Sequence, residues 1–338
     1  MAEAVSAPPG FGRTIITGAG RGVRAFLQLF LIVAPVYTVV TFLKYTPVIR
    51  VFAQFMAPLM RLFGLPGEAA LAVILGNFIN LYAGLGAVTA LKITSAQLTV
   101  LSLMLLLSHS QILETAVFFQ IRAKWWLLWF IRLVTSFLAG VGLSRLIVKT
   151  GPSGTADAAR LAEMAQMRFH GVWPALGNWG RGLADTGVKM LLVLIAIFMV
   201  LEWARRYGIL EKILKAIGVV TRFMGLKKEA GMPWLAGNVF GVVFGAGVIA
   251  ETVREGALDS KQVTLVATFL ALCHGLFEDT AIFMVLGADM FWILVPRIIL
   301  AVIVTWVLGK VIREPKGHSG AKESMIPVNE KAEVNNGK

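Results

Sequence analysis

Charge and cysteine are both scarce in this chain of 338 residues. Charged side chains make up 15% of the sequence, against about a quarter in a soluble domain, and hydrophobic ones make up 57%. The single cysteine, Cys273, excludes an intramolecular disulfide and a metal site built from several thiolates. The sequence has no Walker-type phosphate loop, nucleophile elbow or zinc-protease motif, so we predict no enzymatic activity and no cofactor.

Apolar sequence is abundant instead, with a mean hydropathy of +0.76. Long apolar segments fit helical membrane spans better than the short alternating strands of a barrel, so we predict an all-α integral membrane protein. The net charge of +13 does not indicate a nucleic-acid partner, because much of it lies near the ends of apolar segments, where Lys and Arg contact lipid. Eight apolar stretches are apparent, at about 25–43, 69–91, 98–121, 125–148, 188–203, 232–253, 263–287 and 290–312.

One unit of the sequence occurs twice. Residues 64–143 align with residues 225–308 when one four-residue insertion is allowed. The shared pattern is G-L-x-x-E-A, G-N, G-x-G, S-x-Q-x-T, H-x5-T-A-x-F and a lone arginine, which is Arg132 in the first copy and Arg297 in the second. A duplicated membrane unit with polar groups at matching depths predicts a transporter whose site lies between two halves.

Two of the apolar stretches contain Gly and Asn at close spacing. We interpret residues 67–91 and 228–253 as re-entrant helical hairpins, whose turns survive in a membrane only where protein or water satisfies the backbone. The alternative is a plain span whose small residues pack helices closely. Hairpins give each repeat three crossings and inverted repeats, whereas plain spans give four crossings and parallel repeats. The distribution of Lys and Arg favours six crossings with both termini cytoplasmic.

The chain divides into five predicted segments. An amphipathic stretch precedes each hairpin, at 48–63 and about 209–217, and each could lie in the membrane interface. A short helix is expected near 157–167. The segments are a cytoplasmic N-terminal segment (1–24), a first membrane repeat (25–149), a polar linker (150–186), a second membrane repeat (187–312) and a disordered tail (313–338).

Ionisable groups inside apolar helices are expensive, so they are functional candidates by default. His109 and Glu114 are five residues apart, about 140° around a helix, and would meet only if the helix breaks near residues 108–111. His274 and Glu278, at i and i+4, would share a helix face. The residues expected to bind a coupling cation or proton are His109, Glu114, His274, Glu278 and Asp279.

Uncharged polar groups surround these positions in both copies. We expect the hairpin asparagines and the groups near the helix breaks to contact solute: Asn77, Asn80, Asn238, Ser108, Ser110, Gln111, Thr115 and Thr280. Arg132 and Arg297 either place a cation beside the carboxylates or snorkel towards an interface. The alternative for the whole set is structural: these groups form hydrogen bonds and ion pairs with one another and hold the helices together.

The repeated G-N, G-x-G, S-x-Q-x-T and H-x5-T-A segments resemble the nucleoside-recognition, or "gate", family of bacterial membrane proteins. That family includes spore maturation proteins and the membrane part of B-type ferrous-iron transporters, and it is distantly similar to concentrative nucleoside transporters. The resemblance implies a bacterial inner-membrane protein with inverted repeats of interfacial helix, hairpin, broken helix and span. The N-E-F-V-A-Y signature of the nucleoside transporters is absent, as are the GTPase and membrane cysteines of the iron transporters, so the resemblance supplies a fold and a transporter class without a substrate.

These observations predict a secondary transporter that moves a small polar or charged solute, with nucleoside-like solutes as one option, by alternating access coupled to a cation or proton. Two alternatives remain open. A set of two histidines and three carboxylates could bind a divalent metal as the transported ion, with no tight ligand motif to specify it. A non-transporting membrane scaffold or partner subunit is the other. The expected partners are the solute or ion and membrane lipid, and homo-oligomerisation is left open.

Overall fold

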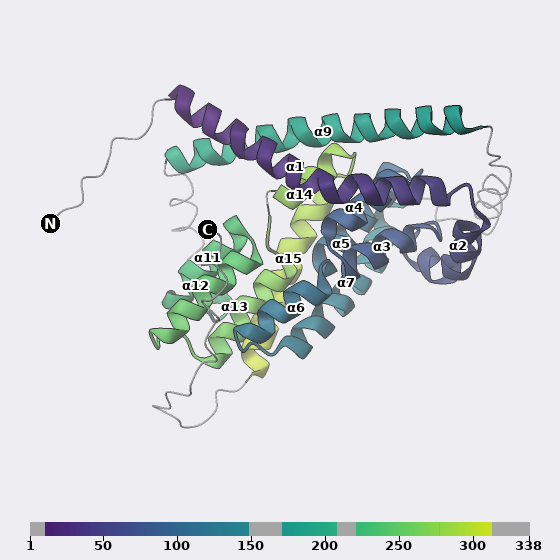
Figure 1. The fold of residues 1–338 in the computed structure, drawn as a ribbon. Coiled ribbons are helices and arrows are strands. Elements are labelled where there is room, and N and C mark those ends of the chain that lie inside the picture. The colour runs from purple at the N-terminus through teal and green to yellow at the C-terminus, as the bar shows by residue number, and fades with distance from the viewer. Residues whose placement is uncertain (1–10, 149–170, 208–220, 277, 313–338) are drawn as a thin grey trace, which may run out of the picture.

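The computed structural model describes residues 11–148, 171–207, 221–276 and 278–312, and within them every regular element is a helix. Two long helices lie across one side of the molecule, and the other helices form a bundle beneath them (Figure 1). The predicted all-α fold is confirmed. The expected helix near 157–167, the amphipathic stretch at 209–217 and the C-terminal tail lie outside the described residues.

The two long helices are α1 (Phe11–Leu43) and α9 (Val172–Arg206), and they pack against each other in antiparallel orientation. A Cβ atom at Gly18 would lie 2.7 Å from the Cα of Met199, and one at Gly22 would lie 2.6 Å from the Cα of Ile195. Since later residues of α1 meet earlier residues of α9, the helices run in opposite directions. The glycines allow the two backbones to touch.

Both helices begin earlier than the sequence boundaries indicated. α9 starts at Val172, within the residues expected to be a polar linker (150–186), and α1 starts at Phe11, within the expected N-terminal segment (1–24). Glycine and charged residues in these stretches resemble linker sequence. Part of the α9 stretch packs on α1, since Trp179 donates to the hydroxyl of Thr38 at 3.0 Å and a Cβ at Gly182 would meet the hydroxyl of Tyr37. Such packing outweighs weak intrinsic helix propensity.

The remaining helices fall into two sets that follow the sequence repeat. The first set is α2 (Pro47–Met60), the 3-10 helix η1 (Arg61–Phe63), α3 (Ala69–Phe78), α4 (Leu81–Thr89), α5 (Ser95–Ser108), α6 (Gln111–Gln120) and α7 (Trp125–Ile147). The second set is the 3-10 helix η2 (Lys228–Ala230), α11 (Gly231–Phe240), α12 (Val242–Arg254), α13 (Ser260–Leu272), α14 (Glu278–Val285) and α15 (Met290–Val311).

Each set contains a helical hairpin where one was predicted. In the first hairpin (α3 and α4), a Cβ at Gly84 would lie 2.8 Å from the Cα of Gly76, and in the second hairpin (α11 and α12) a Cβ at Gly245 would lie 2.6 Å from the Cα of Gly237. The second hairpin turns at Gly241, whose φ of 89° favours glycine. A helix of ten residues is about 15 Å long, half the thickness of a bilayer core. The plain-span alternative is therefore wrong for both segments.

The repeated S-x-Q-x-T motif bonds the next helix of each set to a glycine a few residues before its hairpin. The Gln97 side chain donates to the carbonyl of Gly64 at 2.9 Å, and the Gln262 side chain donates to that of Gly225 at 3.0 Å. Both glycines have positive φ, 64° and 81°. The glutamines thus fix the distance between hairpin and broken helix in both repeats.

Contacts between the repeats show that they are inverted. Ser95, the first residue of α5, donates a hydrogen bond to the carbonyl of Gly287, just after α14. The backbone N–H of Asp289 donates to the hydroxyl of Thr99 at 2.9 Å. The start of one broken helix therefore lies against the end of the other, so α5–α6 and α13–α14 run antiparallel.

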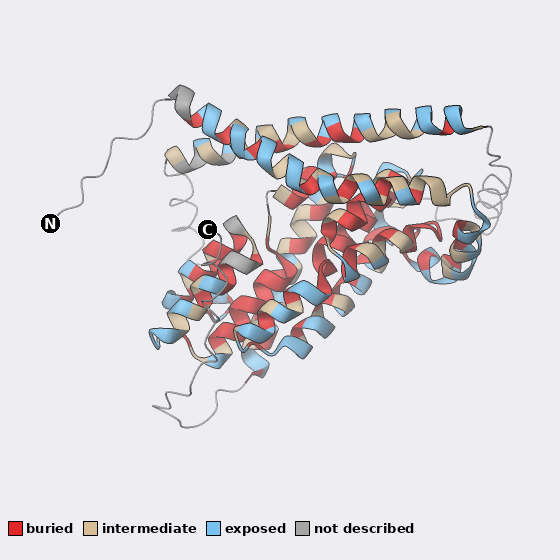
Figure 2. Ribbon diagram, in the orientation of Figure 1, coloured by how far each residue is buried: buried red, intermediate tan, exposed pale blue. Residues whose placement is uncertain are grey.

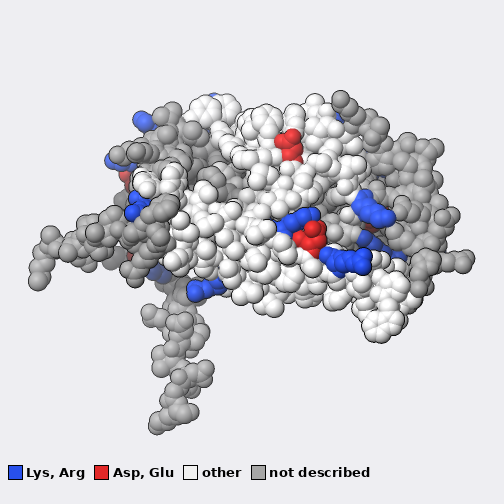
Figure 3. Space-filling model, turned by 90° about the horizontal axis from the view of Figure 1, so that it is seen from above, with Lys and Arg blue, Asp and Glu red and all other residues white. Residues whose placement is uncertain are grey.

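Five helical segments in the described residues are long and apolar enough to cross a membrane: Thr14–Leu43, Ser95–Gln120, Trp125–Ile147, Val172–Val200 and Met290–Val311. Helices α13 and α14, the repeat of α5 and α6, supply a sixth interrupted segment, in line with about six crossings. Buried residues concentrate inside the bundle (Figure 2). The face that carries α1 and α9 is largely uncharged, as expected of a surface in contact with lipid, apart from a group of basic and acidic side chains near its middle (Figure 3).

Candidate functional site

The first broken helix is interrupted where the sequence predicted. α5 ends at Ser108 and α6 begins at Gln111, with His109 extended and Ser110 in the left-handed conformation at φ 54°. The backbone N–H of Ser110 donates to the carbonyl of Gly76 at 2.8 Å. The interruption is therefore held against the first hairpin.

The second broken helix is interrupted between Leu272 and Glu278. This position corrects one expectation. The i and i+4 relation assumed for His274 and Glu278 requires a continuous helix, and the interruption lies between them. Glu278 is the first residue of α14 and is half-buried, whereas the neighbouring Asp279 is buried. The carboxylate that approaches the histidines from this repeat is Asp279, the counterpart of Glu114.

Two buried arginines satisfy carbonyl groups that the interruptions leave free. Arg132 donates to the carbonyl of His109, and Arg297 donates to the carbonyl of His274 at 2.5 Å and, through Nε, to that of Leu272 at 3.0 Å. Both arginines have 0% exposure, so the snorkelling alternative is wrong. Each guanidinium replaces backbone N–H donors that a continuous helix would have supplied.

Polar side chains from the two repeats meet in one buried cluster. Oε1 of Glu114 lies 3.4 Å from Nε2 of His109, 3.5 Å from Nε2 of His274 and 3.2 Å from a terminal nitrogen of Arg132. The two imidazole rings have their centres 5.0 Å apart. Two predicted coupling residues from the first repeat and one from the second are thus brought into contact.

Asp279 completes this cluster. One carboxylate oxygen of Asp279 and one ring nitrogen from each histidine all lie within 4.8 Å of one another. The carboxylate folds over Gly275, which has φ 56°, and a Cβ there would lie 2.3 Å from Oδ2 of Asp279. A side chain at position 275 would displace the carboxylate. We refer to His109, Glu114, His274 and Asp279 as the histidine cluster.

Both histidines are held by their own helices through Nδ1. The Nδ1 of His109 lies 3.0 Å from the carbonyl of Leu105, and that of His274 lies 2.6 Å from the carbonyl of Leu270. A carbonyl oxygen only accepts, so each Nδ1 carries the proton. In a neutral imidazole, Nε2 is then an acceptor with its lone pair directed into the cluster.

The hairpin asparagines make local hydrogen bonds. Asn80 caps α4 by accepting from the N–H of Ala83 at 2.9 Å. Asn77 and Asn238 each donate to the carbonyl four residues earlier, at 2.8 Å. The Oδ1 of Asn77 is buried and has no hydrogen-bond partner within the described residues. Asn77 therefore keeps a free acceptor, and Asn80 has a structural role at the hairpin turn.

Among the other residues predicted to contact solute, some have polar atoms with hydrogen-bond partners and others have polar atoms without them. The hydroxyl of Ser108 donates to the carbonyl of Met104 at 2.9 Å and lies 3.1 Å from the hydroxyl of Ser136, a residue of α7 that no sequence pattern indicated. Ser110 is buried and Thr115 half-buried. Buried polar atoms without a hydrogen-bond partner in the described part of the chain include both amide atoms of Gln111, Oε2 of Glu114 and Oγ1 of Thr280. Unsatisfied buried groups in such number mark a place where a polar ligand or water could bind.

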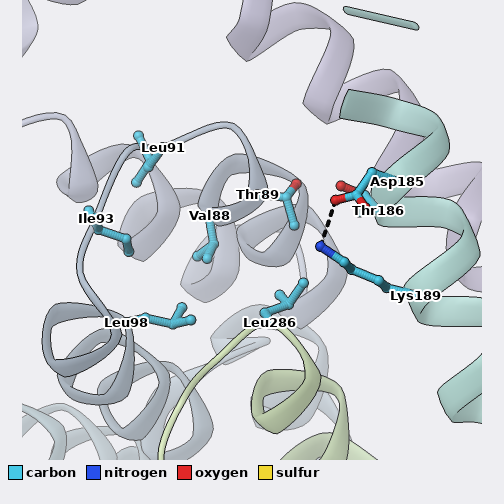
Figure 4. Close-up of a pocket in the computed structure, with 9 residues that line it drawn as sticks. All are labelled: Val88, Thr89, Leu91, Ile93, Leu98, Asp185, Thr186, Lys189 and Leu286. Carbon is cyan, nitrogen blue, oxygen red and sulfur yellow. Dashed lines mark hydrogen bonds and ion pairs between the residues drawn. The ribbon is translucent and has the colours of Figure 1, made fainter. Parts of the chain in front are cut away.

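A second polar region lies where α9 meets the first hairpin. A cavity of about 180 Å³ is lined there by Thr89 at the end of α4 and by Asp185, Thr186 and Lys189 of α9. Asp185 and Lys189 form an ion pair at 2.7 Å (Figure 4). Charged side chains within an apolar helix indicate contact with water or protein in place of lipid.

Comparison with known proteins agrees with this fold. Residues 26–125, which cover most of the first repeat, match the family model Gate, described as "Nucleoside recognition". The chain is 27% identical over 316 residues to the "Uncharacterized membrane protein YvoD" of Bacillus subtilis (strain 168), an alignment that covers 93% of this chain and 99% of that protein. No solved structure matches at a significant level.

The matched segment contains the first hairpin and the interrupted helix with His109 and Glu114, the features on which the resemblance rested. The resemblance is therefore confirmed for residues 26–125, which match the Gate model, and over most of its length the chain is similar to a membrane protein.

Proposed function

We propose that this protein is a secondary transporter that moves a small polar or charged solute across a bacterial inner membrane by alternating access. One observation carries the proposal: both broken helices place their histidine and carboxylate in a single buried cluster between inverted repeats. Burial of so many ionisable groups costs free energy, and such groups in a membrane domain mark ion and substrate paths.

The arrangement supports transport better than a scaffold role. A scaffold would be equally stable with apolar side chains at these depths, since replacing a buried ion pair by well-packed apolar groups is often neutral or stabilising. The unsatisfied atoms of Gln111, Glu114 and Thr280 also have no structural use as they stand. They are instead available to a solute.

The histidine cluster would serve the coupling ion, and the unsatisfied polar atoms beside it would serve the solute. Glu114 contacts both histidines, so a change in its charge or ligation reaches both repeats at once. Asn77, whose Oδ1 is free, belongs to the first hairpin, which is bonded to the same interruption through Ser110. Solute and ion would in this way occupy neighbouring positions.

The test is uptake into proteoliposomes that contain the full-length protein, under an imposed pH gradient or potassium diffusion potential. The probes are labelled uridine, labelled adenosine and radioactive cobalt. We expect at least one of them to accumulate above the level of protein-free vesicles and to be lost in the double variant Glu114→Gln with Asp279→Asn. The exposed Glu251, which pairs with Arg254, gives the matched control Glu251→Gln. Absence of uptake for all three probes, or full uptake by the double variant, would overturn the proposal.

A further inference from the structure

We propose that the histidine cluster binds a divalent first-row transition-metal ion, of the Zn²⁺, Co²⁺ and Ni²⁺ class, through Nε2 of His109 and His274 and carboxylate oxygens of Glu114 and Asp279. This proposal rests on the proposed function, because the metal would be the ion that the transporter carries or couples to.

The first argument is the direction of the lone pairs. Since both Nδ1 atoms donate to main-chain carbonyls, both Nε2 atoms of the neutral rings are acceptors. They face Oε1 of Glu114 at 3.4 and 3.5 Å, and this oxygen is also an acceptor when the carboxylate is ionised. Three acceptors that converge in a buried place repel one another unless something positive lies among them.

A proton satisfies this arrangement less well than a metal ion does. A protonated Glu114 has a single O–H to donate, and it can serve only one of the two histidines. Arg132 approaches the same oxygen at 3.2 Å and also donates to the carbonyl of His109, so these two bonds serve the carboxylate and the main chain and not the Nε2 lone pairs. A metal ion accepts electron pairs from both imidazoles and from a carboxylate at the same time.

The second argument is distance. Ligand atoms about 2.0–2.1 Å from a tetrahedral Zn²⁺ ion lie about 3.3–3.4 Å from one another. The separations between Oε1 of Glu114 and the two Nε2 atoms are 3.4 and 3.5 Å. The oxygen of Asp279 lies within 4.8 Å of the ring nitrogens, so a rotation of its side chain would complete the four ligands.

The surroundings match those of known metal-binding histidines. Such histidines donate their other ring nitrogen to a carbonyl or carboxylate, which fixes the tautomer and ring orientation. Leu105 and Leu270 supply these carbonyls in the two repeats. The main chain of α5 and α13 thus orients both rings for ligation.

The types of ligand favour a transition metal. The cluster offers a ring nitrogen from each histidine beside carboxylate oxygens of Glu114 and Asp279. Two imidazole ligands select against Na⁺, Mg²⁺ and Ca²⁺, which prefer oxygen ligands. The ion class that remains is the transition metals.

The test uses the full-length protein in detergent and titrates it with Co²⁺, whose visible d–d absorption reports tetrahedral nitrogen and oxygen ligands. We expect one Co²⁺ per chain, displaced by Zn²⁺ and unaffected by excess Mg²⁺. His109→Gln keeps an amide N–H for the carbonyl of Leu105 but lacks the imidazole. We expect His109→Gln and Asp279→Asn to weaken Co²⁺ binding at least about tenfold, because loss of even a residue that only hydrogen-bonds a ligand costs about 10–100-fold, while Glu251→Gln binds as the wild type does.

The outcomes separate the two proposals. No Co²⁺ spectrum in the wild type, or an unchanged spectrum in both ligand variants that elute as monodisperse protein, overturns the metal site. Uptake of uridine or adenosine by a protein that binds no Co²⁺ supports the transport function and overturns the metal site. Co²⁺ binding without uptake of any probe supports the site and overturns transport. Binding together with cobalt uptake supports both.

Discussion

Arg297 donates a hydrogen bond to the carbonyl of His274 at 2.5 Å, and Arg132 makes the same bond to the carbonyl of His109. The lone arginine of each repeat is thus a cap for the broken helix of its own repeat. The pairing explains why an arginine recurs 23 residues after each histidine in otherwise apolar sequence.

Because Arg297 caps the second broken helix, we expect the variant Arg297→Met to be much less stable than the wild type. The substitution leaves the carbonyls of Leu272 and His274 without their donor, and each unsatisfied buried group costs about 1–3 kcal/mol. We expect the melting temperature of the purified protein to fall by several degrees. Arg254→Met is the control, because Arg254 lies in an exposed ion pair worth at most about 1 kcal/mol. Equal melting temperatures for the two variants would contradict the assigned role.

The close contact inside the second hairpin predicts opposite effects for two glycines two residues apart. A Cβ at Gly245 would meet the backbone of Gly237 at 2.6 Å, whereas one at Gly247 would meet nothing within 4 Å. Gly245→Ala should lower the melting temperature because the hairpin arms must separate. Gly247→Ala should leave it unchanged or raise it, since alanine in a helix is favoured by roughly 0.5–1 kcal/mol. A loss of stability of the same size in both would mean that the arms do not touch there.

Because α3 and α4 form a hairpin, we expect both ends of this segment to face the same side of the membrane. Cys273 is the only cysteine, so Cys273→Ala gives a background for single-cysteine variants. In that background, Leu62→Cys and Lys92→Cys should react with an impermeant maleimide from the same side in oriented vesicles. Lys124→Cys and Val148→Cys flank α7 and should react from opposite sides. Labelling of positions 62 and 92 from opposite sides would show a plain span.

The start of α13 predicts a pH-dependent contribution to stability. Burial acts to raise the pKa of Asp259, but hydrogen bonds from the Lys227 ammonium and from backbone N–H groups outweigh it and hold the pKa below its usual range. The contribution is therefore present above the ordinary pKa of about 3.9 and is lost as the pH falls through the lower folded value.

The variant Asp259→Asn can keep the cap to the N–H of Gln262 but loses the ion pair with Lys227. We expect it to be less stable than the wild type at pH 7 by at most about 1 kcal/mol, because both side chains are partly exposed. Thermal melts in detergent at pH 7 and near pH 3 would measure this difference. It should be smaller near pH 3 than at pH 7, and a constant difference would contradict the ion-pair account.

The hairpins and the first interruption could be predicted because their residues are unusual inside a membrane. Gly and Asn at close spacing, and a histidine and carboxylate five residues apart, are difficult to place on straight membrane helices. Because the sequence repeats, the same features could also be predicted in the second half of the chain. These signals depend on side chains that stand out from the apolar sequence around them.

Features that depend on the main chain were not predictable in the same way. The bonds from Arg132 and Arg297 end on carbonyl groups, which every residue has, so no sequence pattern points to them. The i and i+4 relation expected for His274 and Glu278 was wrong because the second interruption extends past His274. Gly275, the counterpart of Ser110, has a positive φ as Ser110 has, but it does not reveal how many residues the interruption spans. The early start of α9 was missed because the part of this polar, glycine-containing stretch that packs on α1, from Trp179 onward, depends on tertiary contacts that the sequence does not reveal.

The hydrogen bond from the N–H of Ser110 to the carbonyl of Gly76 joins the first hairpin to the interruption that carries His109. The hairpin cannot swing open alone without breaking this bond in the buried interior of the bundle. The hairpin and its histidine would therefore travel as one body, and the sliding surfaces of any transport cycle should be sought at the outer boundaries of that body.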